Sequence, residues 1–161
     1  MPLAALALTA VVSLVVGSYF LVTGISGKDG GDLAKAQSQA AAAAGSASET
    51  IFSFQYDKLD DHLATSKALM TPAFAKEFES IAPALTELAP QRKIVVQGVA
   101  REAAALPCGS DCSADKVDVL VFLDQARLVG DSKTPTVFAN RVKVSMVRSG
   151  GDWLVSDIRA L

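Results

Sequence analysis

The residues that could carry out chemistry lie together in one short segment, residues 52–63 (FSFQYDKLDDHL). That segment contains Tyr56, Asp57, Asp60, Asp61 and His62, which is the only histidine of the chain. Carboxylates beside an imidazole are typical of general acid–base catalysis, provided that their pKa values are shifted inside an apolar pocket. Aspartates also begin ordinary helices, because they accept hydrogen bonds from free backbone N–H groups and favour the helix dipole.

The sequence favours a structural junction here, with ligand binding and catalysis as the remaining alternatives. We expect Asp57 to cap a helix that begins near Lys58, and we expect His62, offset from that helix's apolar stripe, to be solvated. Phe54 and Tyr56 are expected to anchor the junction in the core. No polar residue stands out within the apolar faces of the predicted strands as a catalytic partner. We therefore expect no catalytic, cofactor or metal site.

Aromatic and acidic residues are the candidates for a pocket, should the domain hold a ligand. They are the residues around the junction together with two aromatic residues from later elements: Phe54, Tyr56, Asp57, Asp60, Phe74 and Trp153.

The beginning of the 161-residue chain has the composition of a membrane anchor. Residues 2–23 carry no charge, and a helix of that length can cross a bilayer core roughly 30 Å thick. A cleaved signal peptide would have a basic start and a shorter apolar core, and a buried soluble helix is the third alternative. The sequence favours a retained transmembrane helix over residues 1–24, followed by a glycine-rich hinge over residues 25–32.

Two cysteines, Cys108 and Cys112, enclose a turn-like Gly-Ser-Asp sequence. A thioredoxin-type motif has two intervening residues, and a zinc site needs further ligands. The spacing favours a disulfide that closes a loop, and disulfides persist outside the cytoplasm. The N-terminus is then cytoplasmic and the domain extracytoplasmic, on the periplasmic side of the plasma membrane.

The charges that follow the anchor argue against one class of partner. The net charge is −2, and the lysines and arginines occur singly or in pairs. A nucleic-acid-binding domain carries a basic face or stripe, so we expect no nucleic-acid partner.

Residues 33–55 are predicted to form an alanine-rich helix, because alanine has the highest helix propensity. Small side chains recur along one face at spacings of three and four, which permits the close approach of another surface. Either the far end of this stalk packs on its own domain, or the face binds a partner protein. The partner-facing residues would be Leu33, Ala36, Ala40, Ala44 and Ala47.

The remainder, residues 56–161, is predicted to complete a single α+β domain. One helix is expected over residues 59–69, and Thr71-Pro72 has the composition of a cap and first turn for another, which Pro90 ends. Four β-rich segments joined by short connections then predict an antiparallel meander: residues 93–106, 116–129, 136–149 and 153–161. The expected fold is three helices packed on a curved four-stranded antiparallel sheet.

Three short motifs in this order carry a resemblance. They are FQYD with LD at residues 54–60, LMTPAF at residues 69–74, and GDWLVSD at residues 151–157. The arrangement resembles the NTF2-like cone fold. More narrowly, residues 33–161 resemble the actinobacterial Mce-associated membrane proteins, which have one membrane helix, an alanine-rich helix and a small extracytoplasmic domain.

The resemblance implies a non-enzymatic role. Mce systems import lipids and sterols across the cell envelope, and the Mce-associated proteins look like accessory or stabilising subunits. The implied partners are the bilayer, Mce proteins and a permease, with no cofactor. A lipid or sterol carrier that uses the NTF2-like pocket is the alternative, and an NTF2-like enzyme is a further one, since fold alone does not decide function.

Overall fold

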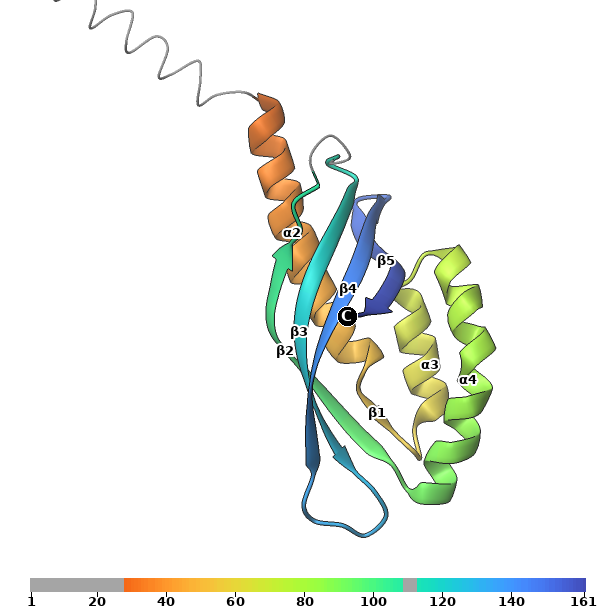
Figure 1. Ribbon diagram of the computed structural model, residues 1–161. Helices are drawn as coiled ribbons and strands as arrows, with labels where there is room; N and C mark the ends of the chain where they lie inside the picture. Colours follow the sequence, from red (N-terminus) through yellow and green to blue (C-terminus); the bar gives the residue numbers. More distant parts are fainter. Residues whose placement is uncertain (1–27, 109–112) are drawn as a thin grey trace, which may run out of the picture. The chain divides into compact units, whose positions relative to one another are not determined.

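The computed structural model of the chain describes residues 28–108 and 113–161 (Figure 1). The predicted transmembrane segment at residues 1–24, the first hinge residues 25–27, and Cys112 lie outside this part. None of the helices in the described ranges is both long enough and apolar enough to cross a membrane. The chain divides into two compact units, residues 1–34 and residues 35–161, and the second holds the sheet and most of the helical residues described here.

The described part contains three helices and five strands, in an order that confirms the expected α+β class. They are α2 (Lys28–Ile51), β1 (Phe54–Gln55), α3 (Leu59–Ala68), α4 (Pro72–Arg92), β2 (Val95–Ala105), β3 (Lys116–Leu128), β4 (Thr136–Ser149) and β5 (Asp152–Ala160). The strands form one antiparallel sheet in the order β1-β2-β3-β4-β5. The short strand β1 is therefore an addition to the four strands that the sequence predicts.

The sheet has one buried face and one wet face, as the alternation of residues along its strands predicts. On β3 and β4 every second residue is buried over Val117–Leu123 and over Val142–Met146. The pairing register shifts between Ala100 and Glu102 on β2 and beside Ser145 on β4. Such bulges bend a strand and increase its twist, which accounts for the strong curl of the sheet in Figure 1.

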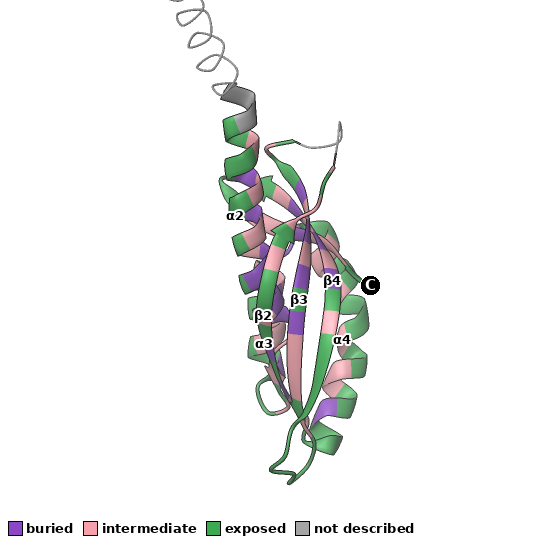
Figure 2. Cartoon of the chain, turned by 60° about the vertical axis from the view of Figure 1, so that its left-hand side comes forward, coloured by how far each residue is buried: buried purple, intermediate pink, exposed green. Residues whose placement is uncertain are grey.

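Helix α2 lies on the buried face of the sheet and turns its buried residues toward the strands (Figure 2). Small side chains make this contact. The buried residues of α2 include Ala36, Ala40, Ala44 and Ala47, whose exposed fractions are 1%, 0%, 0% and 6%. Ala40, Ala44 and Ala47 join the buried valines of β3, β4 and β5 in the core. Because alanine ends at Cβ, the helix backbone can approach the sheet closely.

This packing corrects the prediction of a partner-facing stalk. The face formed by these four alanines covers the sheet of its own domain, so it is not available to another protein. Leu33, the fifth residue of the predicted face, is half-buried and belongs to the N-terminal unit.

The helix boundaries differ from the prediction at three places. Helix α2 already includes residues 28–32, which were expected in the hinge, and it ends at Ile51 rather than at residue 55. Helix α4 continues past Pro90 to Arg92, where Lys93 adopts a left-handed conformation with φ of 49°. A proline removes only its own N–H, and the bond from Ile94 N to Ala89 O (2.9 Å) still closes the helix end.

The junction between α3 and α4 is tied to β5. Thr71 caps α4 as predicted, because its Oγ1 accepts a hydrogen bond from Phe74 N at 3.4 Å. Thr71 N donates to Val155 O and Val155 N donates to Leu69 O, both at 2.9 Å. These two bonds hold the pair of helices against the middle of β5.

The close contact between α2 and the sheet gives a first prediction. Replacing Ala44 by Leu forces a larger side chain into a filled core, so we expect the free energy of unfolding to fall by about 1–3 kcal/mol. The same change at Ala42, which is exposed on α2, serves as the control and is expected to change stability by less than about 0.5 kcal/mol. Urea unfolding followed by circular dichroism measures both variants. Equal stability of the two would contradict the packing described here.

Candidate functional site

Segment 52–63 forms the connection from α2 to α3, and the structure distributes its candidate residues over separate places. Strand β1 pairs Phe54 with Val96, and Tyr56 N then donates to Ile94 O at 3.1 Å. These bonds fix the backbone, so that neighbouring side chains point in different directions. The six residues proposed for a pocket therefore do not form a single site, although three of them, Tyr56, Asp57 and Asp60, share one groove.

Phe54 and His62 line an open groove of about 680 Å³ between the end of α2, α3 and β2. Their ring centroids lie 5.9 Å apart. His62 Nδ1 lies 3.4 Å from the hydroxyl oxygen of Ser66, which is fully buried. His62 is thus half-buried, which corrects the expectation that it is solvated.

Burial lowers the pKa of His62 below its ordinary value, because the charged imidazolium loses hydration. A hydrogen bond with the Ser53 backbone acts in the opposite direction and raises the pKa of His62, but it is the smaller effect. The imidazole is therefore neutral at neutral pH. Three other charged residues line the same groove: Glu49, Lys58 and Asp61.

Tyr56, Asp57 and Asp60 line a different and smaller groove of about 400 Å³, beside α4. Asp57 is exposed and does not cap α3, because the capping position is Lys58, which makes no side-chain capping bond. This corrects the predicted role of Asp57. Asp60 and the residue after it do occupy the first turn of α3, where negative charge favours the helix dipole.

Phe74 and Trp153, the other two candidate pocket residues, pack as half-buried side chains at the edge of the core. The guanidinium carbon of Arg148 lies 5.9 Å from the ring centroid of Trp153, at a distance typical of a cation–π contact. Both aromatic residues therefore contribute to packing. Of the two cysteines only Cys108 is described, and its pairing with Cys112 stays a prediction.

The described side chains supply hydrogen bonds and charge, but no proton relay. The side-chain partner of His62 is the hydroxyl of Ser66, and no carboxylate is hydrogen-bonded to its ring within the described ranges. In the part of the chain that the structure describes, no three or more side chains suited to a metal ion lie together.

A cavity that the sequence analysis missed lies at the inner face of the sheet, below the end of α2. Its volume is about 490 Å³ and its walls include Phe52, Val142 and Ile158. Asn140 Nδ2 donates to Gln125 Oε1 at 2.8 Å, and Gln125 Nε2 donates to Phe52 O at 3.3 Å. Gln125 and Asn140 continue the alternating inward positions of β3 and β4, which is the signal that could have revealed them.

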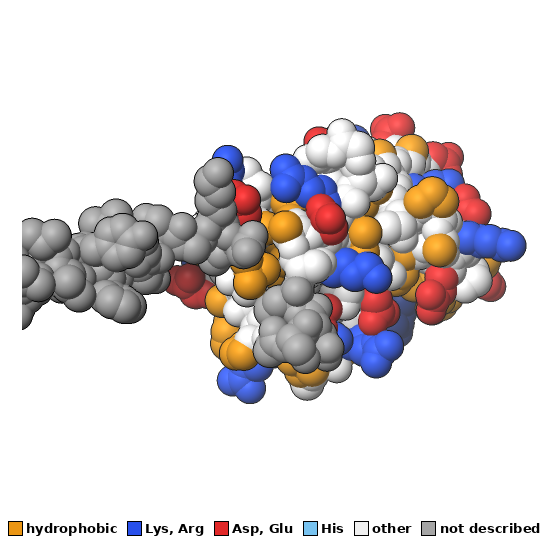
Figure 3. Space-filling view, turned by 90° about the horizontal axis from the view of Figure 1, so that it is seen from above, with side chains coloured by type: hydrophobic (Ala, Val, Ile, Leu, Met, Phe, Trp, Pro, Cys, Tyr) orange, Lys and Arg blue, Asp and Glu red, His pale blue; other side chains and the backbone are white. Residues whose placement is uncertain are grey.

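The outer face of the sheet carries cross-strand ionic contacts. Asp118 accepts hydrogen bonds from Lys143 Nζ at 2.9 Å and from Ser145 Oγ at 2.6 Å. Partial burial raises the pKa of Asp118, but these two bonds, together with the positive charges of Lys143 and Arg159, bring the pKa below its ordinary value. Figure 3 shows charges of both signs interspersed over the side of the domain that is seen from above.

Comparison with known sequences finds distant relatives, and no protein-family profile matches the chain. An uncharacterized protein of Mycobacterium tuberculosis is 27% identical over 117 residues, which are 73% of this chain and 52% of the relative. An outer membrane protein of the same species is 27% identical over 130 residues, 81% of this chain and 79% of the relative. The chain thus spans about half the length of the first relative.

Comparison with solved structures shows the fold. An IcmL-like type IV secretion system protein of Legionella pneumophila has a TM-score of 0.59 at 12% identity, covering 78% of this chain and 91% of that one. CagV, a VirB8 homologue of Helicobacter pylori, has a TM-score of 0.59 at 11% identity, with coverages of 74% and 94%. The periplasmic domain of DotI has a TM-score of 0.58 at 16% identity, with coverages of 75% and 91%. The domain therefore has the NTF2-like fold of VirB8-type domains.

The partly buried histidine gives a second prediction. The unfolded chain binds a proton at His62 near pH 6.5, whereas the folded protein binds it only at lower pH. Because the unfolded state then binds more protons, His62 lowers the free energy of unfolding as the pH falls below neutrality. Between about pH 7.5 and about pH 5.5, we expect a smaller loss of stability for His62→Gln than for the unmodified protein. Urea unfolding at both pH values tests this, and equal losses would contradict the burial of His62.

Proposed function

We propose that the protein is a non-enzymatic accessory subunit that stabilises a multi-protein complex of the cell envelope. The packing of the domain interior supports this proposal. The alanine face of α2 and the fully buried residues Val119, Val121 and Val144 fill the space between helix and sheet. An NTF2-like enzyme would hold its substrate inside the cone, whereas here side chains fill most of that space. We therefore assign the contacts of this subunit to the surfaces of the domain.

The comparisons support an envelope location for the proposed complex. One relative is an outer membrane protein of Mycobacterium tuberculosis, and the fold is shared with proteins of type IV secretion systems, among them a periplasmic domain. By this analogy we propose that the domain lies on the periplasmic side, and from the uncharged composition of residues 1–24 we propose that they anchor the protein once in the plasma membrane. The specific assembly that we propose is an Mce-type importer of lipids or sterols, with Mce proteins and a permease as partners.

Purification from the native membrane gives the third prediction. In mild detergent, the whole 161-residue chain is expected to carry transporter subunits with it in a fixed ratio, as measured by mass spectrometry. Residues 1–34 alone serve as the control and should carry none, because the contact surfaces belong to the domain. Recovery of the whole chain without companions would contradict the accessory role.

A lipid or sterol carrier is a second candidate, and the cavity beneath Phe52 is the observation that favours it. Its volume of about 490 Å³ lies within the range of roughly 300–1,000 Å³ that is typical of small-molecule sites. Most of its lining residues are apolar, and the amides of Gln125 and Asn140 together with Asp124 and Arg141 supply polar groups. Such a lining would suit an amphipathic ligand with a large apolar part.

A cavity-filling variant gives the fourth prediction, which tests the carrier. If the protein carries lipid in this cavity, Ala160→Trp should lose a lipid that the unmodified protein retains after detergent exchange, as measured by mass spectrometry of extracts. Ala73→Trp, at an exposed position of α4, is the control and should retain it. Identical lipid content in all three proteins would exclude the carrier.

A further inference from the structure

Strand β2 is at the edge of the sheet over most of its length. Strand β1 pairs only with its first two residues, Val95 and Val96. Beyond Val96, no strand in the described part of the chain lies on the outer side of β2. The outward N–H and C=O groups of an edge strand form a template for pairing with another chain.

Side chains of the same domain protect the next part of this edge. Gly98 N donates to Ser53 Oγ at 2.8 Å, and Ala100 N donates to a carboxylate oxygen of Glu49 at 2.9 Å. The bulge beyond Ala100 then interrupts the strand. Up to this point the edge is closed to a partner.

The last part of the edge is open. Leu106 N donates to Asp118 O of β3 at 2.7 Å, which sets the alternation of backbone directions along β2. In an antiparallel ladder, residues at odd separations from such a pair direct their backbone groups to the other side. Ala103 and Ala105 therefore present their N–H and C=O groups outward, and no described residue hydrogen-bonds to these groups.

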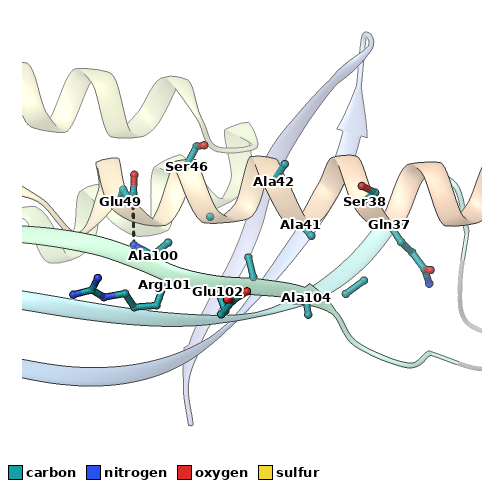
Figure 4. A pocket seen from close by; sticks show the side chains of 13 residues that line it. Gln37, Ser38, Ala41, Ala42, Ser46, Glu49, Ala100, Arg101, Glu102 and Ala104 are labelled. Carbon is teal, nitrogen blue, oxygen red and sulfur yellow. Dashed lines mark hydrogen bonds between the residues drawn. The ribbon is translucent and has the colours of Figure 1, made fainter.

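Helix α2 forms the second wall of a groove along this open edge (Figure 4). The groove has a volume of about 610 Å³ and is lined mainly by small residues, with Ala41 and Ala42 on the helix and Ala103–Ala105 on the strand. Small side chains on both walls leave room for an extended backbone, which lies about 4.8 Å from the strand that it pairs with.

Two carboxylates give the groove a negative charge. Glu49 and Glu102 both line it. Arg101 lines it as well, but its Nε is 2.8 Å from Asp124 Oδ2, so its charge is paired with β3. Glu102 has no ion-pair partner among the described residues. A basic side chain is the complement of such a groove.

We propose that a partner subunit inserts an extended segment with a basic residue into this groove, where it pairs with Ala103 and Ala105 as an additional strand. The proposal deepens the accessory role proposed above, because it names the surface and the chemistry of the contact. The added strand satisfies the open backbone groups of β2, and its basic side chain faces Glu102. Main-chain pairing of this kind provides affinity, and the alternating side chains provide specificity.

A synthetic peptide tests the proposal directly and gives the fifth prediction. The probe is a blocked, fluorescent heptapeptide of alternating valine and lysine, added to the whole chain in nanodiscs of neutral phosphatidylcholine. We expect saturable binding by fluorescence anisotropy and none to empty nanodiscs. The same peptide with N-methylated valines, or with glutamate in place of lysine, should bind about tenfold more weakly or not at all, because it lacks the backbone donors or the positive charge.

Two variants locate the binding site. Ala103→Pro removes an outward N–H that the domain itself does not use, and edge strands tolerate proline at such positions. We expect it to weaken peptide binding by about tenfold or more with little change in the thermal unfolding midpoint. Glu102→Lys should weaken binding of the lysine peptide and strengthen binding of the glutamate peptide. Glu77→Lys, an exposed position on α4, is the matched control and should have no effect.

Several outcomes would overturn the proposal. Absence of saturable binding, or binding that Ala103→Pro and Glu102→Lys leave unchanged, would exclude the groove. Self-association of the chain that Ala103→Pro abolishes would identify a second copy as the occupant instead. If the native membrane complex forms but the peptide fails to bind, the accessory role stands and the strand-docking site falls. If the peptide binds but no complex is recovered, the strand-docking site stands and the accessory role falls.

Discussion

The structure depends on the direct contact between the alanine face of α2 and the inner face of the sheet. Ala40 and Ala44 are completely buried, and their size lets the helix lie almost against the valines of β3 and β4. This contact fills the space beneath most of the curved sheet and leaves the cavity below Phe52, where α2 ends. It also sets α2 beside the edge of β2. The packed interior, the remaining cavity and the edge groove are therefore consequences of one run of small side chains.

The sequence predicts where helices and strands lie better than it predicts which surfaces they contact. The alternation at Val142 and Val144 locates a half-buried strand, and Thr71 with Pro72 locates the beginning of α4. The spacing of the alanines predicts a helix with one small-residue face, but an alanine that contacts its own sheet has the same pattern as one that contacts a partner. The two-residue strand β1 escapes prediction because its pairing with β2 is a tertiary interaction.

The candidate site could be predicted only in part, since neighbours in sequence diverge in space. Phe54 and His62 meet in one groove, whereas Tyr56 and Asp57 turn toward α4 in another. What decides this is the pairing of β1 with β2, which no local pattern contains. Polar groups on the outer face are satisfied by cross-strand partners such as the pair Asp118 and Lys143. The open backbone groups of β2 contrast with this, and they give the domain a place suited to binding rather than to reaction.

The hydrogen bonds of Val155 to the α3–α4 junction have a consequence for how such domains could assemble. Because that junction occupies the middle of the β5 edge, the sheet is blocked on one side, while β2 is open on the other. A filament that grows by strand addition needs two open edges on every subunit. If a partner strand pairs with β2 as proposed, the β5 edge offers no equivalent place for the next strand, so the extended sheet would end at this domain.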